Sequence, residues 1–382
     1  MGDIQDAEMR ESFPWSIDDG STGVEIEDTS SGVEFREPFD PTLIRVNPMP
    51  MNVDLLLKRI ARNELDLSPG FQRKGGIWTE EAQSKLIESI LIRIPIPNIY
   101  VDATDDDHWL IVDGLQRLTA LKRFACGKLR LRGLEFLTDL NGQTYNDLPP
   151  RFRRRILETQ IFVHAIQEGT PPKVKFNIFK RINTGGLPLS AQEIRHALYQ
   201  GKATEFLVRM AGSREFLRAV DNGISDKRMA AQECVLRFAA FTLTPYTAYR
   251  TGDLDGFLNE AMEKTNSLPD TQIEQLQSQF LRVMEAAREI FGGDAFRKRY
   301  TRQHGRYPIN KALFEAWSVN LGELSQEQRQ VLIQKKERLI ERFMALMDER
   351  DFDEAVSQGT GDVRKVKRRF KGIERVIQEV LA

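Results

Sequence analysis

The feature of this sequence that most constrains its fold is the run at 111–121, where an apolar strand pattern passes through one glycine directly into a helical pattern. The apolar spacing after Leu115 predicts a helix that extends to about Cys126, with Gly127 as the residue that ends it. A strand, a tight turn and a helix in immediate succession direct backbone N–H groups and the positive end of the helix dipole toward one point. The run therefore predicts a sheet with a helix packed against it and an anion-binding turn where the two meet.

The rest of the first half alternates helical and strand-like patterns. Apolar residues at helical spacing predict a helix over 53–63 and a second helix that begins after Thr79, whose side chain can cap it. Strand-like runs lie at 98–102, 108–112, 134–137 and 160–166. This half of the chain therefore has the pattern of an α+β domain.

From about residue 172 the pattern becomes helical almost to the end of the chain. Ser190 and Glu193 form a capping box, in which each side chain can bond the other residue's backbone N–H at the start of a helix. Amphipathic segments follow near 202–219, 229–243, 254–264, 271–291, 309–320, 326–349 and 363–381. The predicted fold class is therefore α+β, with an N-terminal mixed domain followed by an all-α helical domain.

The first forty residues differ in composition from the rest. They carry roughly a dozen Asp and Glu against Arg10 and Arg36, although the net charge of the whole chain is −1. Their low apolar content predicts an acidic disordered tail over 1–40, followed by the α+β domain over 41–168 and the helical domain over 169–382. The tail either shields a basic nucleic-acid surface from indiscriminate binding or is a solvated segment without a specific partner.

Composition also argues against several classes of protein. Cys126 and Cys234 are the only cysteines, which speaks against a disulfide framework and against a cysteine zinc site. No apolar run is long enough to span a bilayer, and the acidic N-terminus lacks the basic and apolar regions of a secretory signal. We therefore expect a cytoplasmic protein with no membrane partner, whose oligomeric state the sequence does not indicate.

The strongest candidates for chemistry lie at the turn after the strand. Arg117, in the first helical turn, can make a bidentate contact with phosphate oxygens, and Gly114 lets a phosphate approach the backbone. Asp113 can hold Mg²⁺ or another divalent cation through water, or orient an attacking water, and Gln116 can position that water or contact a base. Asp113, Gln116 and Arg117 are therefore the predicted catalytic residues. The alternative is an ordinary strand-to-helix turn, in which Asp113 caps the helix and Arg117 pairs with it.

Two further polar segments accompany this turn. The first is a basic loop that flanking aromatic residues can pin to the core, and the second is a glycine-containing segment that closes a helix. Their candidate nucleotide-binding residues are Gln72, Arg73, Lys180, Asn183, Thr184 and Gly185. Alternatively, the first is a solvated loop anchored by Trp78, and the second is a glycine C-cap between two helices.

In their order along the chain, these segments resemble the N-terminal domain of GmrSD-type restriction endonucleases. The segments that carry the resemblance are Gln72-Arg73-Lys74 with Trp78, Leu86-Ile87-Glu88-Ser89-Ile90 with Ile94-Pro95-Ile96-Pro97, Asp113-Gly114-Leu115-Gln116-Arg117, and Asn183-Thr184-Gly185-Gly186 with Ser190, Glu193 and Arg195. The resemblance covers about residues 45–380, because 307–314 and 366–370 also look like late segments of the family. It implies a ParB/sulfiredoxin-like nucleotide-binding domain over 41–168, in which a glycine turn followed by an arginine contacts nucleotide phosphates.

The resemblance implies binding or hydrolysis of a nucleoside triphosphate, coupled to recognition of foreign or modified DNA in prokaryotic phage defence. The positions that fall on the family's motifs are Gln72, Arg73, Asp113, Gln116, Arg117 and Asn183. One position departs from the pattern, because Leu115 stands where the family signature usually has glutamine. A leucine that points into the core is harmless there, whereas one that touches the ligand weakens hydrolysis.

Three functions remain open on this reasoning. The first is a divalent-metal-dependent NTPase that changes conformation when it meets DNA, with its nucleotide site between the two domains. The second is a non-catalytic DNA-binding adaptor or sensor for a separate nuclease or effector subunit, which uses the basic stretches at 151–155 and 364–371 on phosphates. The third, by analogy of fold, is a DNA-nicking nuclease. The four histidines are too far apart in sequence to suggest a nuclease metal site.

Overall fold

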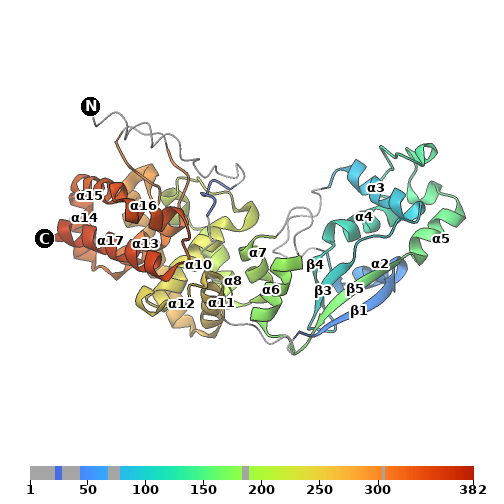
Figure 1. The fold of residues 1–382 in the computed structure, drawn as a ribbon, viewed down its shortest axis with the longest axis horizontal. Coiled ribbons are helices and arrows are strands. Elements are labelled where there is room, and N and C mark those ends of the chain that lie inside the picture. Colours follow the sequence, from blue (N-terminus) through green and yellow to red (C-terminus); the bar gives the residue numbers. More distant parts are fainter. Residues whose placement is uncertain (1–21, 28–43, 68–77, 183–188, 303–305) are drawn as a thin grey trace. The chain divides into compact units, whose positions relative to one another are not determined.

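The computed structural model describes residues 22–27, 44–67, 78–182, 189–302 and 306–382 of the chain. The chain divides into two compact units (Figure 1). Pro38–Leu198 form one, called the sheet unit below, and Met1–Glu37 together with Tyr199–Ala382 form the other, called the helical unit. The predicted fold class, a mixed α+β region followed by a mostly helical one, is confirmed. Among the helices that the structure describes, none combines the length and the apolar character needed to cross a membrane.

A five-stranded mixed sheet forms the centre of the sheet unit (Figure 1). Its strands are β1 (Val46–Asn52), β2 (Leu65–Asp66), β3 (Ile99–Ala103), β4 (Trp109–Asp113) and β5 (Gln160–Gln167). Their order across the sheet is β1-β5-β3-β4-β2, with β3 antiparallel to β4 and parallel to β5. The strands predicted at 98–102, 108–112 and 160–166 are therefore confirmed to within one residue at each end.

Helices cover both faces of this sheet. They are α2 (Val53–Ala61), α3 (Glu80–Leu91), α4 (Leu115–Ala125), α5 (Pro150–Glu158), α6 (Pro172–Ile182) and α7 (Ala191–Leu198). Alternate strand residues such as Ile99, Ile111 and Val163 pack with apolar side chains of α2 to α5 in the larger core. The opposite face, which contains Val112 and Ile166, packs with α6 and α7. This division follows from the two-residue period of a strand, which sends successive side chains to opposite faces.

The strand predicted at 134–137 is wrong. The backbone N–H groups of Glu135, Phe136 and Leu137 donate to the Glu88 carboxylate of α3 at 2.8–3.0 Å, and the segment is irregular. These N–H groups are satisfied by a side chain, so they need no neighbouring strand. Burial by itself would raise the pKa of Glu88, but the three backbone donors outweigh it and hold the pKa below its ordinary value.

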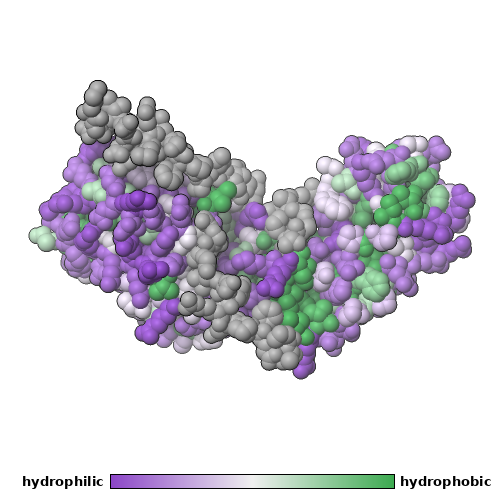
Figure 2. All heavy atoms as spheres, viewed as in Figure 1, coloured by the Kyte–Doolittle hydropathy of each residue, from purple (hydrophilic) through white to green (hydrophobic). Residues whose placement is uncertain are grey.

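The helical unit is built from helices that match the predicted amphipathic segments, except α16, which falls between two of them and was not predicted. They are α8 (Lys202–Ala211), α9 (Arg214–Ala219), α10 (Ala230–Leu243), α11 (Leu254–Ser267), α12 (Asp270–Phe291), α13 (Lys311–Glu323), α14 (Gln326–Gln334), α15 (Lys336–Asp348), α16 (Arg350–Ser357) and α17 (Val363–Leu381). Two predicted segments each divide into two helices, because Ser213 caps the start of α9 and α14 ends at Gln334, with Lys335 as its C-cap. The visible surface over α14 and α17 is predominantly hydrophilic, as expected for amphipathic helices (Figure 2).

Part of the acidic N-terminal segment is ordered in the helical unit. Residues 22–27, called the N-terminal strap below, form a backbone hydrogen bond from the N–H of Glu25 to the carbonyl of Ile309 at 2.8 Å. Val24 of the strap is buried and forms a parallel β-bridge with Ile309. For these residues the structure differs from the expected disorder, because their carboxylates have buried basic partners. The rest of the segment over 1–40 lies outside the described residues.

Candidate functional site

Asp113 ends β4 at an irregularity of the sheet. Tyr100 of β3 pairs with Asp113, whereas the next residue of β3, Val101, pairs with Ile111. Val112 is therefore an extra residue on β4, which makes this a β-bulge. Bulges redirect side chains at the ends of strands, and the Asp113 side chain is 27% exposed. The strand thus ends with a carboxylate that reaches solvent.

Gly114 makes the turn from β4 into α4. Its φ is 106°, and a Cβ atom at this position would lie 2.9 Å from Cγ1 of Ile99 in the core. A left-handed conformation and a close neighbour together require glycine here. No described side chain caps the first turn of α4, so Asp113 is not its cap. The first N–H groups of a helix have no acceptor within the helix, so this turn offers backbone donors to an anion.

Arg117 is held inside the sheet unit by its neighbours. Its guanidinium donates to Oδ2 of Asp113 at 2.6 Å, to the carbonyl of Pro97 at 2.6 Å and to the carbonyl of Asn98 at 3.0 Å. The side chain is 10% exposed. Arg117 therefore ties the end of β4 and the start of α4 to the segment that enters β3. The ion pair belongs to the alternative interpretation of this turn, whereas the helix cap that this interpretation also required is not formed.

Leu115 and Gln116 have different surroundings although they are adjacent in the chain. Leu115 is buried in the larger core of the sheet unit, so the departure from the family signature points into the core. The Oε1 atom of Gln116 accepts a hydrogen bond from the backbone N–H of Trp78 at 3.4 Å. Trp78 packs partly buried against the same core. Gln116 therefore contacts the chain where the predicted basic loop ends.

The two flanking segments lie mostly outside the described residues. The candidate residues that lie outside are Gln72, Arg73, Asn183, Thr184 and Gly185. Lys180 is exposed in the last turn of α6. The predicted capping box is confirmed, because the N–H of Ser190 donates to Glu193 at 2.6 Å and the N–H of Glu193 donates to Oγ of Ser190 at 3.1 Å.

The structure also shows a polar cluster that sequence reasoning missed. Lys175 of α6 donates to both oxygens of the Asp102 carboxylate, at 3.0 and 3.2 Å, and to the hydroxyl of Thr104. Asp102 and Lys175 are both buried. The sequence did contain a signal for this cluster. Asp102 in a strand pattern and Lys175 in a helix pattern are charged residues at positions that the apolar spacing places inward. This ion pair joins the end of β3 to α6.

Aromatic residues lie beside the Asp113 turn on the face of the sheet that α6 and α7 partly cover. The rings of Tyr100 and His164, on neighbouring strands, stack with centroids 4.7 Å apart. The side chain of Asn98 contacts Nε2 of His164 at 3.0 Å. Arg117 also donates to the carbonyl of Asn98. Asn98 therefore links the stacked rings to the Asp113 turn.

A divalent cation at this turn would have Asp113 as its protein ligand. Within the described ranges, no group of three or more His, Cys, Asp or Glu side chains is arranged to hold a metal ion. Mg²⁺ commonly binds proteins through one or two carboxylates and takes its other ligands from phosphates and water. One solvent-facing carboxylate beside an anion-binding turn fits that mode of binding.

The fold and the turn define a mixed α+β domain with an acidic residue and a glycine at the start of a helix. Residues 54–200, from α2 to just beyond α7, match the family model of the GmrSD restriction endonuclease, N-terminal domain. Over this stretch the chain is similar to the GmrSD N-terminal domain, and the resemblance inferred from the motifs is confirmed there. Neither a curated protein nor a solved structure matches the chain. The ParB/sulfiredoxin-like fold, and the resemblance beyond residue 200, stay predictions.

Proposed function

We propose that this is a restriction-type, anti-phage defence protein that acts on DNA, and that its sheet unit binds and hydrolyses a nucleoside triphosphate at the Gly114 turn. The match of residues 54–200 to the GmrSD N-terminal domain supports the action on DNA. The nucleotide site rests on one observation. Asp113 reaches solvent at the end of β4, directly before a helix start that no described side chain caps.

Each residue of the turn has a role in this proposal. Phosphate oxygens accept hydrogen bonds from the first backbone N–H groups of α4, which Gly114 leaves open to close approach. Asp113 orients the attacking water or holds a divalent cation, which when bound neutralises charge on the phosphates. Arg117 fixes the Asp113 carboxylate through their 2.6 Å contact. Gln116 positions water or the end of the basic loop.

The flanking segments complete the proposed nucleotide site. Lys180 and the residues outside the described part of the chain supply contacts to phosphate, sugar or base. The latter are Gln72, Arg73, Asn183, Thr184 and Gly185. These assignments follow from the family motifs.

The test is phosphate release from ATP, GTP, CTP and UTP with Mg²⁺, with and without DNA. Asp113→Asn keeps the size of the side chain and should abolish turnover, because the amide carries no charge for the cation or the water. Asp106→Asn is the matched control, since Asp106 is an exposed acid in the turn between β3 and β4. It should leave turnover unchanged, and circular dichroism should show both variants folded. Turnover that survives Asp113→Asn would contradict the assigned site.

A second candidate function is DNA binding without turnover, and one feature of α5 favours it. Among the described residues, no carboxylate pairs with Arg151, Arg153 or Arg154. Arg153 and Arg154 line a surface hollow of about 470 Å³ whose lining also includes Tyr145 and the carboxylates of Asp54 and Glu158, neither of which is paired with these arginines. Arginines without acidic partners suit DNA phosphates. Salt-sensitive DNA binding by wild-type protein that releases no phosphate from any nucleotide would establish this function instead.

A further inference from the structure

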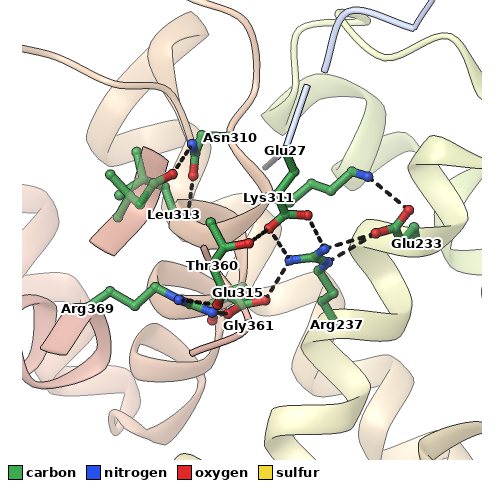
Figure 3. Close-up of polar contacts among 12 residues, drawn as sticks. Glu27, Glu233, Arg237, Asn310, Lys311, Leu313, Glu315, Thr360, Gly361 and Arg369 are labelled. Carbon is green, nitrogen blue, oxygen red and sulfur yellow. Dashed lines mark hydrogen bonds and ion pairs between the residues drawn. The ribbon is translucent and has the colours of Figure 1, made fainter. Parts of the chain in front are cut away.

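The helical unit contains a buried ionic network in which the N-terminal strap takes part (Figure 3). Arg237 of α10, 2% exposed, contacts the carboxylates of Glu27, Glu233 and Glu315. Glu315 of α13 in turn pairs with Arg369 of α17. A buried charge is tolerated only when it is paired and hydrogen-bonded. The charges of three helices therefore depend on one another and on Glu27, which the chain supplies from its N-terminal end.

The strap presents its two glutamates to separate basic partners. Both oxygens of Glu27 accept from Arg237, and the hydroxyl of Thr360 also donates to this carboxylate. The Glu25 carboxylate accepts from Nζ of Lys298 at 2.7 Å and from Nδ2 of Asn310 at 2.9 Å. These contacts join residues that are more than two hundred positions apart in the sequence.

The alternation from Glu25 to Glu27 is that of an extended peptide. In extended chain, successive side chains point to opposite sides, so Glu25 and Glu27 face the helices together. Ile26 between them is 52% exposed. Backbone pairing fixes this register, because the N–H of Ile309 donates to the carbonyl of Gly23 at 3.2 Å. Gly23 has φ +72°, and a Cβ there would lie 1.8 Å from the carbonyl oxygen of Gly223. The site thus selects glycine at one position and carboxylates at two others.

The charges around Glu27 favour its ionised form. Burial alone would raise the pKa of Glu27, but the positive charges of Arg237 and Lys311 outweigh burial and hold the pKa below its ordinary value. For Glu315, burial raises the pKa above its ordinary value despite Arg369 and Arg237. The network therefore favours the charged form of Glu27 in the strap more strongly than that of Glu315 in α13.

We propose that the helical unit carries a binding site for an extended acidic peptide of the pattern Gly-Val-Glu-X-Glu, and that the N-terminal strap is its resident ligand, held by its charges. The chain leaves the helical unit after the strap and returns to it between Leu198 and Tyr199.

Charge reversal in the full-length protein tests whether the charges hold the strap. Glu25→Lys and Lys298→Glu each replace an ion pair whose charged atoms are 2.7 Å apart with two like charges. Either variant should raise amide hydrogen exchange of the peptides that contain 22–27 and 306–313 by about tenfold or more. The double variant restores an opposite pair and should return both peptides toward wild-type exchange. Ile26→Ala is the matched control and should leave exchange unchanged, because this side chain faces solvent.

A second measurement tests the binding site itself. A synthetic peptide of residues 20–29 should bind the Glu25→Lys protein and reduce exchange at 306–313, whereas the same peptide with glutamine at both glutamate positions should not. If the Glu25→Lys protein does not fold, addition of the acidic peptide should recover its circular dichroism signal, whereas the Lys298→Glu protein should not respond because its site repels the peptide. The proposal is overturned if both single variants keep wild-type exchange over 22–27, which would show that Val24 and backbone pairing hold the strap without its charges. It is also overturned if the acidic and glutamine peptides act equally.

Discussion

The two arginine-rich helices of this protein, α5 in the sheet unit and α17 in the helical unit, have similar compositions and opposite environments. On α5, Arg151 and Arg154 are exposed, and neither forms an ion pair with a described carboxylate. On α17, Arg369 is fully buried against Glu315, and Arg375 pairs with Glu349 at 2.5 Å. The same side chain therefore holds a core together in one helix and remains available to a partner in the other.

The difference shows why basic composition alone does not identify a nucleic-acid surface. Both stretches qualified as DNA candidates because only the number of charges was visible. In the structure, Arg368 of α17 is already paired with Asp351, and Lys365 donates to the carbonyl of Gln358 at 2.8 Å. A cation that has an intramolecular partner must lose it before it can contact a phosphate. The comparison therefore favours α5 over the paired residues of α17 for the proposed DNA contacts.

The largest effect should come from the buried arginine of α17. Arg369→Ala leaves Glu315 in the core without its closest cation, and removal of one partner of a buried pair costs about 3–5 kcal/mol. Urea denaturation followed by circular dichroism measures the free energy of unfolding. Arg154→Ala on α5 is the matched control and should stay within about 0.5 kcal/mol of wild type. If both variants lost the same free energy of unfolding, the contrast between α5 and α17 would be wrong.

The next effect depends on pH and on the strap that joins the α17 network. The folded pKa of Glu27 lies below the ordinary value of 4.5, so its stabilisation is complete above that pH and is lost as pH falls through the folded pKa. Glu27→Gln should therefore cost about 1.5–3 kcal/mol near neutral pH, the value of a hydrogen bond to a charged group. Urea denaturation at several pH values from 7 to 3 should show that the difference in free energy of unfolding between the variant and wild type becomes smaller in acid. A gap that does not change with pH would mean that Glu27 is neutral in the folded protein.

A smaller effect is expected on α5, and it concerns DNA binding. Arg153→Gln/Arg154→Gln removes two charges that have no acidic partner in the described structure. Each lost phosphate contact lowers the salt slope by about 0.9, so the double variant should bind about tenfold more weakly with a slope reduced by about 2. Fluorescence anisotropy with labelled duplex DNA over a range of salt concentrations measures both quantities. An unchanged slope would exclude α5 from the DNA surface.

The smallest effect should come from the outward basic residues of α17. Arg364→Gln/Lys367→Gln changes side chains on the solvent side of the helix, where the Arg364 guanidinium is 95% exposed. Stability should change by no more than about 0.5 kcal/mol, and the salt slope of DNA binding should stay at the wild-type value. The same two assays used for α5 apply here. A loss of DNA affinity as large as that of the α5 variant would show that both helices contact DNA.

The sequence by itself determined the features of this protein that depend on neighbouring residues. The strands β3, β4 and β5, most of the helices, the Thr79 cap and the Ser190 capping box were predictable, because each involves positions close together in the chain. The strands β1 and β2 and the helices α5 and α16 were not predicted. The turn at Gly114 was also predictable, since a strand pattern meets a helix pattern there with no residues between them.

Only the tertiary structure decided which polar groups meet. Arg117 binds the carbonyls of Pro97 and Asn98, about twenty residues earlier, and Glu88 takes the N–H groups that a strand at 134–137 would have used. Glu27 of the strap pairs with Arg237, which lies 210 positions later in the sequence. Such contacts depend on how distant elements pack, and local periodicity contains no information on that packing. For the same reason, the arginines of α5 and α17 could not be distinguished until their neighbours were known.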